Sequence, residues 1–198
     1  MTQTDFSRDC KTAVLTLFLA ASLLAATSLT AKAQKVSIET NALEYVNFVT
    51  LNAETGLAVG RHGSINAAVR YNPFEFHGGE DHHVMRNRQF TLGLGGRWWP
   101  WHIFSGWWLG GKAQYQVYNS GGIISPETRQ GQRVGAGISA GYSYLFSPHF
   151  NLDFGIGGWA GMDYYTLFDC PVCGVTKEAG KKPFILPNEL ILGISYIF

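Results

Sequence analysis

The sequence predicts an all-β protein, an eight-stranded antiparallel up-and-down transmembrane β-barrel, on the basis of three observations. Apolar residues alternate with small or polar residues along most of the chain after residue 34, and no long helical periodicity interrupts them. Glycine, with 24 residues, and aromatic residues, at 14%, are abundant together, which suits closely approaching strands with aromatic belts. The connections between the expected strands are mostly long at one rim and short at the other, as in barrels of this type.

The first 33 residues are typical of a secretory signal peptide. Two basic residues, Arg8 and Lys11, precede an apolar run over residues 13–26. Ala-Lys-Ala at 31–33 then has the small-x-small pattern of a cleavage site. The apolar run is shorter than the roughly 20 residues that a membrane-spanning helix needs. We therefore expect residues 1–33 to be removed rather than to anchor the chain.

Residues 34–198 are expected to form one barrel domain with no affinity for nucleic acid. The whole chain has a formal net charge of +1, and the leader carries one more basic than acidic residue, so the mature chain is formally neutral. A neutral chain lacks the basic footprint by which proteins hold nucleic-acid phosphates. Cys10 leaves with the leader, so Cys170 and Cys173 are the cysteines of the mature chain.

The period-2 pattern predicts eight strands. They are expected at residues 35–44, 50–60, 64–74, 87–98, 107–118, 132–146, 150–166 and 185–198. Three connections are long, at 75–87, 119–131 and 167–184, whereas the link after the first strand is short. Long loops at one rim indicate a barrel in the outer membrane of a Gram-negative bacterium, with these loops outside the cell.

The two faces of each predicted strand differ in chemistry. In the last strand, Leu190, Leu192 and Ile194 share an apolar face. The opposite faces of the strands carry glycines and the isolated charges Glu39, Glu54, Arg70, Arg97, Lys112, Arg133, Asp153 and Glu189. Side chains fill the interior of an eight-stranded barrel, and buried charges must pair there. We expect a structural ion-pair network, with a proton relay or gated ion path through the same residues as the alternative.

A cluster of tryptophans marks the link between the fourth and fifth predicted strands. It consists of Trp98, Trp99, Trp101, Trp107 and Trp108, and Tyr142, Tyr144 and Phe146 approach the same rim. Tyrosine and tryptophan favour the headgroup level of a membrane. We expect the cluster to lie at the periplasmic interface, with stacking on a carbohydrate as the alternative.

The last strand carries a pattern of its own. Gly193 precedes the alternating aromatic residues Tyr196 and Phe198. This arrangement is similar to the C-terminal strands of outer-membrane barrels that the barrel-assembly machinery recognises, although Ile191 occupies a position that is often polar there. We expect Gly193, Tyr196 and Phe198 to be an assembly signal, with this machinery and outer-membrane lipids as partners.

Several segments together resemble a known family. They are "ETNALEY" at 39–45, "VRYNPFEF" at 69–76, "QYQVYNSGGI" at 114–123, the stretch 135–165 and "CPVCG" at 170–174. Through them the mature chain resembles an uncharacterised family of outer-membrane proteins from the Bacteroides group, catalogued as domain of unknown function 3575. The resemblance implies a small outer-membrane barrel. It implies no known activity and assigns no functional residue.

No catalytic residue is assigned. An enzyme at the outer rim would need a base, an orienting carboxylate and a nucleophile. Residues of these types occur in the long loops, at His77, Glu80, Asp81, His82, His83, Ser120, Ser125 and Asp169. No serine lies in a nucleophile-elbow setting and no pair of carboxylates recurs, so we predict solvated polar loops and no enzyme.

Cys170 and Cys173 lie in the last long loop, and their state stays open. No reducing pool exists outside the cell, so a disulfide that pins a tight turn, or a pair of thiols, is expected there. The alternative is zinc, which binds thiolates and imidazoles tetrahedrally. His82 and His83 would then complete the site, or His77 would replace one of them. No other cofactor is expected.

The expected function is a structural or surface-interaction role. The barrel would supply a rigid frame, and the long loops would bind a surface protein or a glycan. A metal-binding or lipid-modifying surface barrel that uses loop histidines and cysteines is the second hypothesis. The third is a soluble barrel whose apolar face points inward around an apolar ligand.

Overall fold

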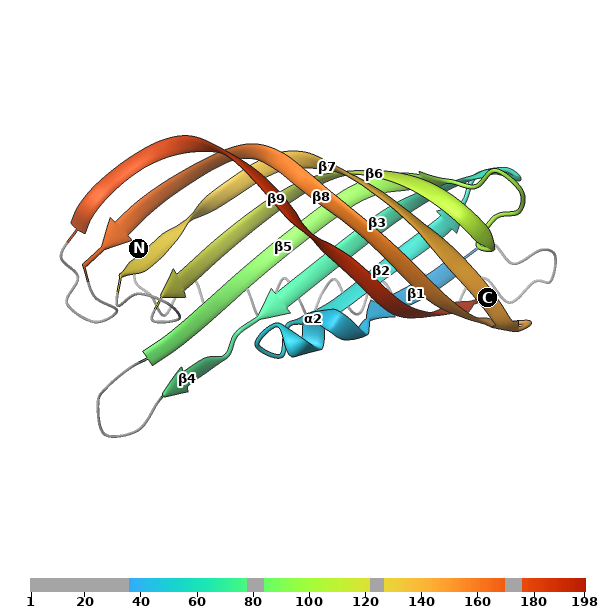
Figure 1. Ribbon diagram of the computed structural model, residues 1–198, viewed down its shortest axis with the longest axis horizontal. Coiled ribbons are helices and arrows are strands. Elements are labelled where there is room, and N and C mark those ends of the chain that lie inside the picture. Colours follow the sequence, from blue (N-terminus) through green and yellow to red (C-terminus); the bar gives the residue numbers. More distant parts are fainter. Residues whose placement is uncertain (1–35, 78–83, 122–126, 170–175) are drawn as a thin grey trace. The chain divides into compact units, whose positions relative to one another are not determined.

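Eight antiparallel strands close into a barrel in the computed structural model of the protein, which describes residues 36–77, 84–121, 127–169 and 176–198 (Figure 1). The strands are β1 (Val36–Asn41), β2 (Leu51–Ala58), β3 (Gly63–Asn72), β5 (Val84–Trp98), β6 (Gly106–Gly121), β7 (Thr128–Ser147), β8 (Phe150–Phe168) and β9 (Thr176–Ile197). Each pairs with its neighbour in the chain, and β1 pairs with β9 to complete the ring. A short strand, β4 (Glu75–His77), continues the sheet beside β5. The predicted closed eight-stranded antiparallel barrel is confirmed.

The first connection contains a short helix, α2 (Ala42–Val46), where the sequence predicts that the strand continues. Asn41 ends β1 and caps the helix, because its side-chain oxygen accepts a hydrogen bond from the backbone N–H of Leu43. The helix turns Glu44 toward the interior, where Arg70 Nε lies 3.3 Å from its carboxylate. The alternation of apolar and polar residues does not reveal a local helix cap. The end of this strand was therefore predicted wrongly. Within the described ranges, no helix is long and apolar enough to cross a membrane.

The strands reach further toward the long-loop rim than the sequence predicts. β9 begins at Thr176 rather than at residue 185, and β5 begins at Val84. Backbone pairing continues through these extensions, as between Gly180 and Tyr165. The loops expected at 75–87, 119–131 and 167–184 are therefore shorter than predicted. Their ends belong to the neighbouring strands β4, β5, β6, β7, β8 and β9. Charged and polar residues crowd the extensions, so the alternation that marks the rest of each strand is lost there.

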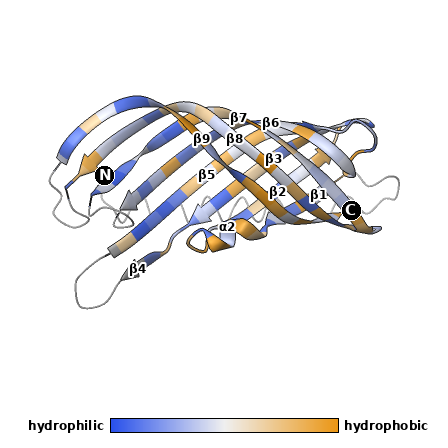
Figure 2. Cartoon of the chain, viewed as in Figure 1, coloured by the Kyte–Doolittle hydropathy of each residue, from blue (hydrophilic) through white to orange (hydrophobic). Residues whose placement is uncertain are grey.

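The barrel carries its apolar side chains on the outside. Ile138 is 79% exposed and Ile185 is 82% exposed, whereas Asp153, on the inner face, is 2% exposed. Figure 2 shows the resulting alternation of hydrophobic and hydrophilic residues along the strands, and a mostly hydrophilic start of β9. This arrangement is the reverse of a water-soluble barrel, so it contradicts the hypothesis that the apolar face points inward around a ligand.

An apolar cluster fills the interior near the short-turn rim. It consists of Trp99, Phe104, Trp108, Ile191 and Ile197. The rings of Trp99 and Trp108 lie 6.3 Å apart, and both side chains are 1% exposed. These two tryptophans therefore belong to the core and not to an outer belt, which corrects the prediction for two of the five. The other three, Trp98, Trp101 and Trp107, are more than half exposed.

Candidate functional site: the charged interior of the barrel

A chain of ion pairs crosses the middle of the interior. Lys112 Nζ, on β6, lies 2.8 Å from a carboxylate oxygen of Glu54 on β2 and 2.8 Å from one of Glu189 on β9. Arg97, on β5, lies 2.8 Å from Glu39 on β1 and 2.9 Å from Glu54. None of these strand pairs are neighbours in the sheet. Each contact therefore links strands that the backbone hydrogen bonds of the sheet do not join directly.

Arg70 extends this chain toward α2. Its guanidinium lies 3.3 Å from Glu189 and 3.3 Å from Glu44. We call these seven side chains the lower cluster: Glu39, Glu44, Glu54, Arg70, Arg97, Lys112 and Glu189. Six of them were predicted from strand parity. Glu44 was missed because it lies on a helix. The sequence does carry a signal for that helix, since Asn41 followed three residues later by Glu44 is a pattern typical of a helix start.

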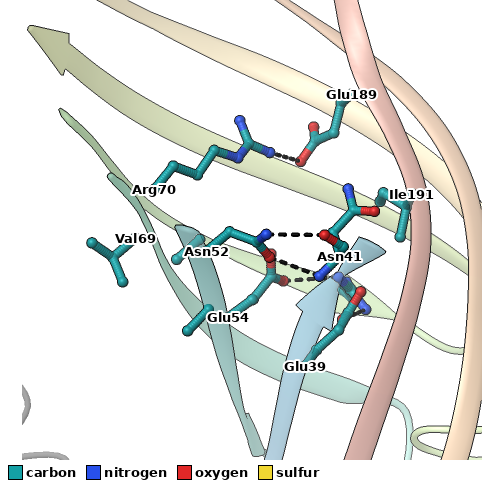
Figure 3. Close-up of a pocket in the computed structure, with 11 residues that line it drawn as sticks. Glu39, Asn41, Asn52, Glu54, Val69, Arg70, Glu189 and Ile191 are labelled. Atoms are coloured by element: carbon teal, nitrogen blue, oxygen red, sulfur yellow. Dashed lines mark hydrogen bonds and ion pairs between the residues drawn. The ribbon is translucent and has the colours of Figure 1, made fainter. Parts of the chain in front are cut away.

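A small cavity adjoins the lower cluster, bordered by the carboxylates of Glu39, Glu54 and Glu189 (Figure 3). Its volume of about 20 Å³ is close to the space of a single water molecule. Asn41 and Asn52 close one side, since each donates a hydrogen bond to an oxygen of the other, at 2.7 and 2.9 Å. A cavity of this size accommodates water and excludes a sugar, a lipid or a peptide.

Two residues of the predicted network lie apart from the lower cluster. Asp153 accepts hydrogen bonds from the hydroxyls of Ser143 and Ser195, the latter at 2.6 Å, and no described side chain forms an ion pair with it. Arg133 donates from Nε to Asp163 at 3.2 Å. The inner charges are thus divided between separate groups, because strand parity gives the face of a residue and not its height.

Asp163 is the centre of an upper cluster on the inner wall of β6, β7 and β8. The side chain is 1% exposed and accepts a hydrogen bond from the hydroxyl of Tyr118 at 2.8 Å. Arg133 and Arg129 share its other oxygen, at 3.2 and 3.1 Å. Arg129 stacks over the ring of Tyr165 at 4.0 Å. Asp163 has the same strand parity as Asp153, which places it on the inner face, whereas Arg129 fell within the expected loop 119–131 and was missed.

Uncharged side chains join the upper cluster to the opposite wall. Arg133 donates to Gln116 at 3.2 Å, Gln116 donates to Gln89 at 2.7 Å, and Gln89 donates to Thr50 at 3.4 Å. Buried amides that hydrogen-bond one another are held in fixed orientations. From the short-turn rim upward, the interior therefore has an apolar end, a charged middle, a layer of amides and a cationic upper wall. We use the term upper wall for the inner face of β6 to β9 around Asp163.

The residues considered for catalysis or metal binding were assigned from the sequence to the long loops. Most fall outside the described residues, namely Glu80, Asp81, His82, His83, Ser125, Cys170 and Cys173. His77 belongs to β4 and Ser120 to β6, and Asp169 follows β8 with Lys177 Nζ at 3.9 Å. Among the residues whose positions are described, no three His, Cys, Asp or Glu side chains gather as they would around a metal ion.

The three residues considered as an assembly signal lie on β9 and directly after it. A Cβ atom at Gly193 would lie 2.8 Å from Glu39 Oε1, so a side chain there would displace the Glu39 carboxylate of the lower cluster. The rings of Tyr196 and Phe198 are 4.6 Å apart, and Phe198 is 47% exposed. Its backbone N–H donates to Val36 at 2.8 Å, which extends the seam between β1 and β9.

Comparison with known protein families identifies one match, which covers nearly the whole chain. The model of a family described as protein of unknown function, DUF3575, matches residues 18–198. The chain belongs to this family. No curated protein and no solved structure matches it significantly. Membership in DUF3575 therefore agrees with the resemblance found in the sequence, and the inner clusters are the features from which a function has to be argued.

Proposed function

We propose that the protein is a small outer-membrane β-barrel of a Gram-negative envelope, with a structural or surface-interaction role. The observation that carries this proposal is the inversion of the two faces, with apolar side chains outside and charged side chains inside. In water, an exposed apolar band of this extent would drive association. In a bilayer, lipid tails cover such a band while the closed ring satisfies the backbone hydrogen bonds.

Exposed aromatic residues near the short-turn rim support the same proposal. Trp98, Trp101 and Trp107 point outward, and the ring of Tyr142 lies 5.3 Å from that of Trp107. An amphipathic ring is stable at the boundary between lipid tails and water. In this proposal the short-turn rim lies at the periplasmic interface and the long loops are outside the cell.

The proposed role is that of a rigid frame without channel or enzyme activity. The apolar cluster, the ion pairs and the amide layer occupy successive levels of the interior, which argues against steady conduction. The inner carboxylates are engaged in ion pairs or hydrogen bonds, which argues against a general base among them. Binding is then left to the long loops and the upper wall, with a surface protein or glycan as partner.

Export and assembly follow from the same proposal. Residues 1–33 direct the chain to the envelope and are removed. Gly193, Tyr196 and Phe198 engage the barrel-assembly machinery, and outer-membrane lipids then surround the apolar band.

The test is the behaviour of purified protein in detergent and on a denaturing gel. A closed membrane barrel resists denaturation at room temperature, so the unheated sample should migrate faster than the boiled one. The same protein should enter the detergent-rich phase on partition with a non-ionic detergent. Recovery in the aqueous phase, together with identical migration of both samples, would show that the barrel is soluble and that the proposal is wrong.

A further inference from the structure

The charges of the interior are unevenly distributed between its two levels. The lower cluster has four carboxylates, Glu39, Glu44, Glu54 and Glu189, and three cations, Arg70, Arg97 and Lys112. On the upper wall, Arg129, Arg133 and Lys182 face the single buried carboxylate of Asp163. The amide layer of Gln89 and Gln116 adds no charge between the two. The upper wall therefore carries a surplus of positive charge.

The surplus cations have donor atoms that the described side chains do not use. Asp163 is already shared, since Tyr118 donates to one oxygen and two arginines approach the other. Arg129 Nε is buried and has no hydrogen-bond acceptor in the described part of the chain. Among the same residues, no carboxylate pairs with Lys182, which is in register with Asp163 on the adjacent strand. Such unused cationic donors favour a ligand that brings its own negative charge.

One aromatic ring, that of Tyr165, contacts two of these cations. Arg129 lies 4.0 Å and Lys182 Nζ lies 5.5 Å from the centre of the Tyr165 ring. The hydroxyl of Tyr165 donates to Glu178 at 2.7 Å, which orients the ring and engages this carboxylate. Cations that are oriented before a ligand arrives lose less conformational freedom when they bind it.

Within the described part of the chain, β1 does not extend to the level of the upper wall. β1 pairs with β9 only from Ile197 to Gly193, so the stretch of β9 that carries Lys182 extends beyond the last paired residue (Figure 1). Pro183 and Lys181 lie on this stretch, and proline and lysine are residues that discourage an added strand. The upper wall is therefore better suited to a small ligand than to a paired peptide.

We infer that Arg129, Arg133 and Lys182 form a binding site for the phosphate group of a water-soluble ligand, such as a sugar phosphate, that enters at the long-loop rim. A phosphate monoester carries close to two negative charges near neutral pH and several acceptor oxygens. The unpaired Nε donor of Arg129 and the ammonium of Lys182 match these oxygens. The site lies on the inner wall, so a soluble ligand reaches it more directly than a lipid outside the barrel does.

The test is calorimetric titration of the full protein in an uncharged detergent at low ionic strength. The probes are glucose 6-phosphate, glucose as its uncharged analogue, and dihexanoyl phosphatidic acid as a lipid phosphate. We expect saturable binding of glucose 6-phosphate and none of glucose. The double variant R129Q/K182Q should raise the Kd at least tenfold, and K182Q alone at least threefold.

The matched control is K181Q, which removes an exposed lysine one position away on the opposite face of β9. This variant should bind glucose 6-phosphate as the native protein does. An equal loss in K181Q, no saturable binding, or binding of the lipid phosphate alone would each overturn the inference. The gel shift on heating, measured on the same preparation, tests the barrel separately, so failure of this site is distinguishable from failure of the proposed function.

Discussion

Arg97 and Glu39 form an ion pair of 2.8 Å that joins β5 to β1 across the interior of the barrel. Their side chains are 7% and 8% exposed, so neither charge is compensated by bulk water. Arg97 also lies over the ring of Trp108, at 4.3 Å from its centre. This one guanidinium therefore connects the charged middle of the barrel to the apolar cluster below it.

Replacing Arg97 by methionine should destabilise the barrel strongly. The variant R97M leaves Glu39 and Glu54 buried without this partner, and breaking a buried pair in this way typically costs about 3–5 kcal/mol. Urea unfolding in lipid vesicles should show a correspondingly lower free energy of unfolding. The control is R88M, which removes an arginine that is 42% exposed and should cost less than about 1 kcal/mol. Equal stability of the two variants would contradict the assigned role of Arg97.

Adding a side chain at Gly141 should disturb the apolar cluster. A Cβ atom at this position would overlap the indole ring of Trp108, which fills the space next to β7. The variant G141V should therefore lower the free energy of unfolding by about 1–3 kcal/mol through overpacking. The same change on the outer face, A136V, meets no such ring and serves as the control. A native-like midpoint for G141V in urea would mean that Trp108 does not pack as described.

A lysine placed in the middle of the outer face should destabilise a membrane barrel but not a soluble one. Ile138, on β7, is 79% exposed. In a bilayer, I138K should cost about 2–4 kcal/mol near the midplane, and the folded fraction after refolding into vesicles should fall. In a soluble barrel the same change would be neutral or would improve solubility. Q130K, on the same face near the hydrophilic rim, is the control and should insert normally.

Neutralising Asp163 should weaken the upper cluster. The variant D163N leaves Arg129 and Arg133 without their shared carboxylate, and we expect a loss of about 3 kcal/mol in the free energy of unfolding. The control D169N alters a side chain that is 66% exposed and should leave stability unchanged. The measurement is again the urea midpoint in vesicles, and a D163N midpoint equal to that of D169N would contradict the cluster.

The sequence alone was enough to predict the barrel and the chemistry of its two faces. Alternation around Glu189 and Lys112 places both on the inner face, because a strand turns successive side chains to opposite sides. Trp108 lies an even number of residues from Lys112 on the same strand, so alternation also predicts that Trp108 faces inward. This was overlooked because the five tryptophans were assigned together to the membrane interface. The prediction that the first strand continues through residues 42–44 was wrong, because Asn41 caps a helix that begins at residue 42.

Tertiary structure alone decided which inner charges meet. Lys112 contacts Glu54 and Glu189 because ring closure brings β6 opposite β2 and β9, and the height of each residue depends on the tilt and register of the strands. Arg133 therefore pairs with Asp163 at a different level, although its parity is that of the lower cluster. Parity is a property of a single strand and can be read from the sequence, whereas contact across the interior is a property of the closed ring.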